Sequence, residues 1–316
     1  MPVDQSLLGC VLSEKFSDES DVRFAEAGIQ VDFRVSGTQF IGRWEELKRS
    51  GAVGVFLWKQ AAKFRIYKPH RQRRGTCVAR GFHRALEMSY LHTLGNKVAV
   101  GNPVDIAWEP IYAGSRVYPG KGQLSGDGSV GAWAGEWLAG VKGNGGFCQR
   151  GQYGSADLSK DNEQWAVANG NRGARFPKEL LDECKSHTCS VHRLRANHEI
   201  ADAIASYFGV ARCWNTLFGN RNANGMSVAS DTGAHCQAVI GVFVQPNGED
   251  GFVEAQSWGD NIPSGPRELK LKGGESIELP PGCYGVSWGE YQKAQQRSKW
   301  WEAHAVSVRS GQEYRK

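Results

Sequence analysis

Apolar residues change their spacing along this chain. In the first part they recur every three or four positions, which is the spacing of one face of an α-helix. This pattern predicts helices over 42–51, from Cys77 onward, and over 106–116, 129–141, 175–185 and 197–209. After residue 209 the apolar residues alternate with polar ones or form short continuous runs, and both patterns are typical of strands.

Most predicted strands lie in the last third of the sequence. They cover 52–58, 189–196, 210–218, 235–245, 251–259, 268–288 and 302–309, with one short helix over 288–301. Residues 142–175 are rich in Gly, Asn and Gln, and this composition predicts a loop. Helices followed by strands indicate a segregated α+β fold rather than alternating βαβ units.

Composition narrows the class of protein only a little. The chain has 316 residues, a formal net charge of +5 and eight cysteines. No stretch has the basic and apolar parts of a secretory signal, and no apolar run is long enough to cross a membrane. We therefore expect a cytoplasmic protein with no membrane span, whose cysteines are mostly reduced and in part buried.

One cysteine occupies a position suited to chemistry. In the stretch RRGTCVARGFHRALE, over residues 73–87, Cys77 follows a turn and precedes a helical pattern. A helix N-terminus carries partial positive charge, which lowers the pKa of a thiol and favours the reactive thiolate. Gly75 allows a sharp turn and a close approach of the backbone to a substrate. The alternative is a small residue that simply packs under the helix.

A cysteine nucleophile needs a base, and the base needs an orienting partner. His235 opens the apolar strand of SDTGAHCQAVIGVF, which would place an imidazole at the edge of a sheet. Gln256 could hold the second ring nitrogen, and the indole of Trp258 could shield that hydrogen bond from water. The alternative is a buried histidine beside an edge-strand glutamine and a core tryptophan.

Together these stretches resemble the active-site segments of papain-like cysteine peptidases. GTCVARGF resembles the cysteine helix, GAHCQAVIGV the histidine strand, and QSWG the Asn-Ser-Trp-Gly motif. GDGS, with Gly126 and Gly128, resembles the glycine-bearing stretch that lines the substrate cleft. The resemblance implies substrate contacts from Gly75, Gly126, Gly128 and Trp258. The three motifs are spaced more widely than the about 130–150 residues typical of papain, which implies insertions.

The resemblance implies a fold and a mechanism. The fold would have a helical lobe over 61–180 and an antiparallel β lobe over 181–316, preceded by an N-terminal extension over 1–60. Cys77 would attack a peptide carbonyl, and His235 would give a proton to the leaving amine. The Cys77 N–H and an upstream glutamine side chain would bind the oxyanion.

Three positions depart from the family pattern. Gln256 stands where the family has Asn, and Val78 where it usually has an aromatic residue. The oxyanion glutamine normally lies six residues before the cysteine, but Arg71 is there and Gln72 lies one position later. A catalytically weak domain with a structural role is therefore an alternative to an active peptidase.

The end of the chain, from SWGDNIPSGP onward, resembles papain-like proteins encoded by tailed bacteriophages. This looser resemblance implies a phage-encoded protein that is located in the virion or in the cytoplasm. Its partners would then be a peptide or protein substrate and other virion proteins. A further alternative keeps the same chemistry but cleaves an amide bond of peptidoglycan.

Two other readings use different residues. A zinc site could draw on Cys184, His187, Cys189, His192 and His198, but their spacing is irregular for such a site. The basic stretch 59–74 could contact phosphates of a nucleic acid, although a solvated basic surface is the commoner explanation. We expect neither a metal nor a cofactor, and we consider nucleic acid an improbable partner.

Overall fold

The computed structural model describes residues 8–36, 38–59, 67–94, 105–260 and 263–308. Within these residues one antiparallel sheet has the strand order β12-β9-β8-β5-β13-β4, and β1 pairs with β8 beside this path. Its strands are β1 (Gly54–Phe56), β4 (Cys189–Leu194), β5 (Gly209–Trp214), β8 (His235–Val244), β9 (Asp250–Ala255), β12 (Cys283–Ser287) and β13 (Glu302–Val308). The predicted α+β class is therefore confirmed.

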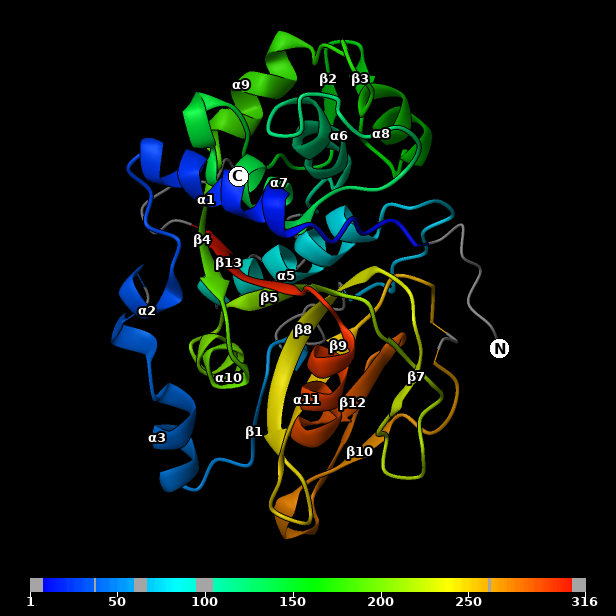
Figure 1. Cartoon of the computed structure of the whole chain (residues 1–316). Helices are drawn as coiled ribbons and strands as arrows, with labels where there is room; N and C mark the ends of the chain where they lie inside the picture. Colours follow the sequence, from blue (N-terminus) through cyan, green and yellow to red (C-terminus); the bar gives the residue numbers. More distant parts are fainter. Residues whose placement is uncertain (1–7, 37, 60–66, 95–104, 261–262, 309–316) are drawn as a thin grey trace.

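Helix α5 (Cys77–Leu94) is the central helix of the molecule and lies against β8, β5 and β13. Its predicted apolar face is present, because Val78, Phe82 and Leu86 are fully buried. A group of helices lies at one end of the molecule, drawn in green in Figure 1. They are α6 (Glu109–Val117), α7 (Gly131–Ala139), α8 (Glu163–Asn169) and α9 (Lys178–Ser186).

The first part of the chain forms α1 (Glu14–Glu26), α2 (Phe33–Ser36) and α3 (Arg43–Arg49). Buried polar contacts attach α1 to the rest of the molecule. The Ser17 hydroxyl donates to Glu302 of β13 at 2.6 Å, and Arg23 Nε donates to Glu136 of α7 at 2.8 Å. The segment that the sequence presents as an extension thus contacts both the helical region and the sheet.

The stretch 142–175, predicted as a loop, contains regular structure. It forms the short hairpin β2 (Gln152–Tyr153) and β3 (Ala156–Asp157), followed by α8. The prediction was wrong because α8 has one fully buried residue, Ala166, and begins with an Asn162 cap rather than an apolar stripe. The sequence also gave no signal for α1, whose buried residues are Ser17, Ser20 and Phe24.

The remaining elements complete the β region and its edges. They are α10 (Asn197–Ala205), α11 (Trp288–Arg297), β6 (Leu217–Phe218), β7 (Ala229–Asp231), β10 (Glu268–Lys270) and β11 (Ser276–Glu278). None of the helices in the described part of the chain is both long and apolar enough to cross a lipid bilayer.

A fully buried ion pair connects the central strands. Arg212 of β5 donates from Nε to Glu254 of β9 at 2.8 Å, and neither side chain has any exposed surface. Glu254 also accepts hydrogen bonds from the hydroxyls of Tyr284 and Tyr291. A buried carboxylate that loses its cation keeps the full cost of its desolvation, so this pair constrains the sheet.

We predict that Arg212→Met lowers the free energy of unfolding by about 3–5 kcal/mol, because Glu254 would remain buried and unpaired. Urea denaturation measures the change. Lys178→Met is the matched control, since the ion pair of Lys178 with Asp182 is exposed and exposed ion pairs contribute little to stability. Equal stability of the two variants would contradict the prediction.

Candidate active site

Cys77 is the first residue of α5, and the loop before it is held from one side by α8. Glu163, the first residue of α8, accepts a hydrogen bond from the Thr76 hydroxyl at 3.0 Å. The same carboxylate accepts from the backbone N–H of Arg73 at 3.2 Å. Glu163 therefore fixes the turn that delivers Cys77 to the start of the helix.

His235 is the first residue of β8, as the sequence predicts, and the start of this strand lies against Cys77. The backbone N–H of Cys236 donates to the Cys77 sulfur. The imidazole is fully buried under Trp258, with ring centroids 4.2 Å apart and an interplanar angle of 19°. Trp258 thus covers the histidine ring itself, while its predicted roles in shielding a hydrogen bond to Gln256 and in binding substrate stay predictions. Neither ring nitrogen of His235 has a hydrogen-bond partner among the described residues.

Gln256 does not make the predicted hydrogen bond to His235. Its Oε1 accepts from the backbone N–H of Trp258, and its Nε2 donates to the carbonyl of Gly259 at 3.4 Å. The carboxamide is used to close the turn of its own loop, and this local pairing competes with the imidazole for the same oxygen.

Gln72 is joined to that same loop. Its backbone N–H donates to the Ser257 carbonyl at 2.8 Å, and its Oε1 accepts from the Ser257 hydroxyl. Its Nε2 donates to the carbonyl of Arg74 at 3.0 Å. The structure therefore brings Gln72 and the Gln256–Trp258 loop together, while the oxyanion role of Gln72 stays a prediction. Sequence reasoning missed Ser257, the residue that connects them.

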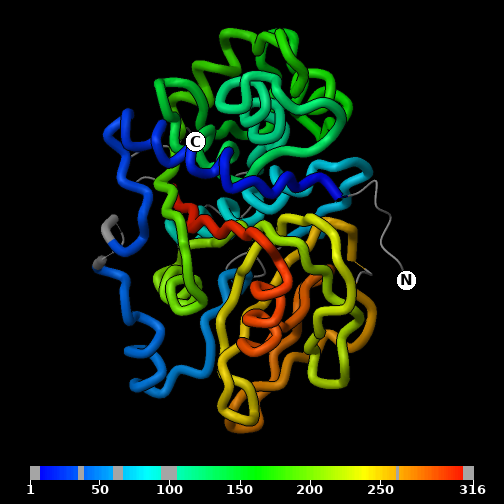
Figure 2. Tube along the Cα trace, in the orientation of Figure 1, coloured from blue at the N-terminus to red at the C-terminus, as the bar shows by residue number. Residues whose placement is uncertain are grey.

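A segment far away in the sequence crosses this site. We call residues 8–12 the N-terminal strap. Ser129 donates its N–H to the Gly9 carbonyl at 2.9 Å and accepts from the Val11 N–H at 2.8 Å. A Cβ built on Gly233, two residues before His235, would lie 2.6 Å from the Leu8 side chain. Figure 2 shows the strap in blue, passing between the green helices and the yellow strands.

Glycines make this crossing possible. A Cβ on Gly9 would lie 1.9 Å from the Gly75 carbonyl oxygen, so no other residue fits there without movement. Gly128, with φ of +111°, would bring a Cβ to 2.8 Å from the Gly9 oxygen. Two of the glycines predicted to contact substrate, Gly75 and Gly128, therefore contact the strap. A Cβ on Gly126 would meet no atom within 4 Å, which leaves open space beside that third glycine.

Burial keeps both candidate catalytic groups neutral. It raises the pKa of the Cys77 thiol to about 12, with a smaller contribution from Cys10 on the strap. Burial, followed by the charge of Arg212, lowers the pKa of His235 to about 3. The predicted thiolate–imidazolium pair is therefore not formed in this conformation. Desolvation outweighs the stabilisation of a thiolate at the helix N-terminus.

The structure gives little support to the other two hypotheses, a zinc site and a nucleic-acid contact. Among the described residues, potential metal ligands gather in one group, His70, His83 and Glu87, which shares no residue with the predicted zinc set. Within the basic stretch 59–74, residues 60–66 lie outside the described part. Arg74 forms an ion pair with Asp127 at 2.9 Å, so part of this positive charge is used internally.

Solved structures with a similar fold are cysteine proteases. Xylellain from Xylella fastidiosa aligns over 97% of this chain and 93% of its own, with a TM-score of 0.52 and 11% identity. Digestive procathepsin L 3 of Tenebrio molitor aligns over 93% and 90%, with a TM-score of 0.47 and 16% identity. Bromelain from Ananas comosus aligns over 82% and 100%, with a TM-score of 0.44 and 12% identity. No protein-family model and no curated protein sequence matches the chain.

At 11% identity, the likeness to xylellain establishes the fold alone. The chain therefore has the α+β fold of the papain-like cysteine proteases, as its motifs led us to expect. Cys77 and His235 lie on the elements that the resemblance assigned to them, the start of a central helix and the start of a sheet strand. The link to bacteriophage proteins stays a prediction.

We predict that iodoacetamide alkylates Cys77 of the native full-length chain at about pH 8 far more slowly than an ordinary thiol of pKa about 8.5. The buried thiol, with its raised pKa, is almost entirely protonated at this pH. Mass spectrometry of peptides measures the modification, and the urea-unfolded chain is the control. Equal rates in the native and the unfolded chain would contradict the burial of Cys77.

Proposed function

We propose that the protein is a papain-like thiol peptidase whose active site is covered by its own N-terminal strap. The observation that supports this proposal most strongly is that the start of β8, which carries His235, lies against the Cys77 sulfur in a fold like that of cysteine proteases. The thiol lies at a helix N-terminus, the backbone N–H of Cys236 donates to its sulfur, and the imidazole of the preceding His235 lies under the indole of Trp258. This is the pairing of nucleophile and base that acyl transfer through a thiol requires.

The proposed reaction proceeds through a thioester. The Cys77 sulfur forms a bond to the carbonyl carbon of a peptide while His235 takes the thiol proton. His235 then gives that proton to the leaving amine as the C–N bond breaks. Water, deprotonated by the same imidazole, attacks the thioester and releases the acid and the free thiol. The Cys77 N–H, at the open end of α5, would donate to the oxyanion.

Gln256 is the third residue of the proposal. It precedes Trp258 on the loop that covers His235, so a rotation of its side chain would turn the carboxamide from that loop toward the imidazole. The proposed Cys-His-Gln arrangement forms when this rotation occurs. Because Gln72 is bound to Ser257 of the same loop, the rotation and the placement of the oxyanion glutamine are connected.

In this proposal the strap contributes to the burial that keeps these groups neutral. Burial is the largest cause of both pKa shifts, and Cys10 of the strap is the second cause of the shift at Cys77. Departure of the strap would admit water to the thiol and the imidazole and would return both pKa values toward their ordinary range. It would also free Gly75 and Gly128, where a substrate backbone could take the place of Gly9.

One observation favours a second candidate function. His235 has no hydrogen-bond partner among the described residues, and Gln256 is turned to its own loop. A domain that keeps the fold without catalysis, for example as a structural part of a virus particle, would have no need of a charged pair. The two functions differ in whether Cys77 becomes reactive once the strap is displaced.

We predict that Gly9→Ala activates the protein, because its Cβ would clash with the Gly75 carbonyl and displace the strap. If the strap binds about 1.4 kcal/mol more weakly, the fraction of molecules whose strap has left the site rises about tenfold. Hydrolysis of casein and of a peptide mixture measures the gain, and muropeptides test the peptidoglycan alternative. Gly219→Ala is the matched control, since its Cβ would meet only ordinary contacts, at 3.4 Å from Ser230.

Two further variants test whether Cys77 and His235 carry out the hydrolysis. Cys77→Ser in the Gly9→Ala background should abolish hydrolysis, and His235→Ala should reduce it by about 10²–10⁴-fold. If folded Gly9→Ala hydrolyses none of these substrates while its Cys77 is accessible to alkylation, the peptidase proposal fails and the structural role takes its place.

A further inference from the structure

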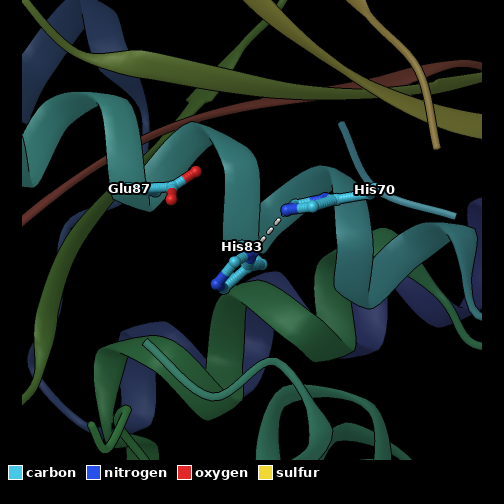
Figure 3. A group of neighbouring side chains, drawn as sticks. All are labelled: His70, His83 and Glu87. Carbon is cyan, nitrogen blue, oxygen red and sulfur yellow. Dashed lines mark hydrogen bonds between the residues drawn. The ribbon is translucent and has the colours of Figure 1, made fainter. Parts of the chain in front are cut away.

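Three potential metal ligands meet on the side of α5. Figure 3 shows His83 and Glu87 one turn apart on this helix, with His70 reaching toward His83 from the neighbouring segment. One ligand atom of each side chain lies within 4.8 Å of the other two. His83 is buried, whereas His70 and Glu87 are half-buried, so water can reach this group from one side.

The contacts of His83 leave one nitrogen available. Its Nε2 lies 2.8 Å from the Ile106 carbonyl, which can only accept, so this nitrogen carries the proton. Nδ1 therefore presents a lone pair, and it faces His70 Nε2 at 3.2 Å. A ligating histidine characteristically donates its other N–H to a backbone carbonyl, which fixes the tautomer and the orientation of the ring.

The spacing of the two nitrogens suits one metal ion. Two ligands of a tetrahedral Zn²⁺, each at about 2.0–2.1 Å, lie about 3.3–3.4 Å apart. The observed separation between His83 Nδ1 and His70 Nε2 is 3.2 Å. In the ion-free state His70 Nε2–H donates to His83 Nδ1. On binding, His70 moves its proton to Nδ1, and Glu87 approaches by rotation of its side chain.

Three arginines lie near the group, and each forms an ion pair, the partner of Arg84 being the proposed ligand Glu87 itself. The pairs are Arg80 with Asp161, Arg84 with Glu87, and Arg150 with Glu109. Burial lowers the pKa of both imidazoles, and the charges of Arg84, Arg80 and Arg150 act in the same direction. Glu87 would bind the ion through the oxygen that Arg84 leaves free.

We propose that His70, His83 and Glu87 form a binding site for one divalent transition-metal ion, with Zn²⁺ as the best match to this ligand set. Imidazole and carboxylate suit Zn²⁺ and Co²⁺, while Mg²⁺ and Ca²⁺ prefer oxygen ligands. Three protein ligands leave a fourth position for water or a small anion. This site departs from our expectation, from the sequence, of a protein without metal.

The ion would join two parts of the candidate active site. His83 lies on α5, the helix that begins with Cys77, and His70 lies two residues before Gln72. The His70 carbonyl also accepts from the Gly259 N–H at 2.8 Å, which connects this segment to the loop that carries Trp258. A bound ion would therefore hold the Gln72 segment against α5. The site does not depend on peptidase activity.

Metal binding tests the proposal directly. Chelator-treated full-length chain is titrated with Co²⁺, and Zn²⁺ is then used to displace it. We expect one ion per chain and a visible Co²⁺ spectrum of a four-coordinate nitrogen and oxygen site, without a sulfur charge-transfer band. His70→Gln and Glu87→Gln should each weaken metal binding at least tenfold. Even the loss of a residue that only hydrogen-bonds to a metal ligand lowers metal affinity about 10–100-fold.

His198→Gln is the matched control, because His198 is an exposed histidine outside the group. Circular dichroism confirms that each variant is folded, and His70→Gln and Glu87→Gln are chosen over variants of buried His83 for this reason. Absence of stoichiometric binding by the wild-type chain would overturn the proposal. So would unchanged affinity in both variants, or a sulfur charge-transfer band that places the ion on cysteines.

Discussion

The close approach of three glycine backbones is the constraint on which the covered conformation of the candidate active site depends. Gly9 lies against Gly75 and Gly128 at a distance that leaves no room for a side chain. Next to this contact Cys77 is buried beside the strap, His235 is buried under Trp258, and burial is the largest influence on both pKa values. A thiol at a helix N-terminus and an imidazole at the start of β8 are both present, but the charged pair that they could form is not.

A second feature connects the parts of the site. Residues 70–72 pair with 257–259 through backbone hydrogen bonds, Gly259 to His70 and Gln72 to Ser257. This pairing joins the loop before Cys77 to the loop that covers His235. We therefore expect each of the proposed changes, departure of the strap, rotation of Gln256 or binding of an ion at His70, to affect both loops. Thr76 and Glu163 anchor the same loop from the helical side.

The sequence could predict the elements that carry the chemistry. The helix starting at Cys77 and the strand starting at His235 have strong periodic patterns, and local pattern is what a single sequence reports. The strap could not be predicted, since its contacts join Gly9 to residues far along the chain. Helix α1 gave no apolar stripe because polar Ser17 and Ser20 are buried there by bonding to distant carboxylates. Similarly, the local pairing of Gln256 and the meeting of His70 with His83 depend on tertiary contacts.

The most direct test is the pH dependence of Cys77 alkylation in a chain that begins at Ser13, with and without His235→Ala. If the strap alone suppresses the catalytic pair, the shortened chain should alkylate Cys77 well below the pH at which an ordinary thiol reacts, near about 8.5. His235→Ala should then shift the profile back to that ordinary range. A shortened, folded chain whose Cys77 reacts like any other thiol, with or without His235, would contradict the account.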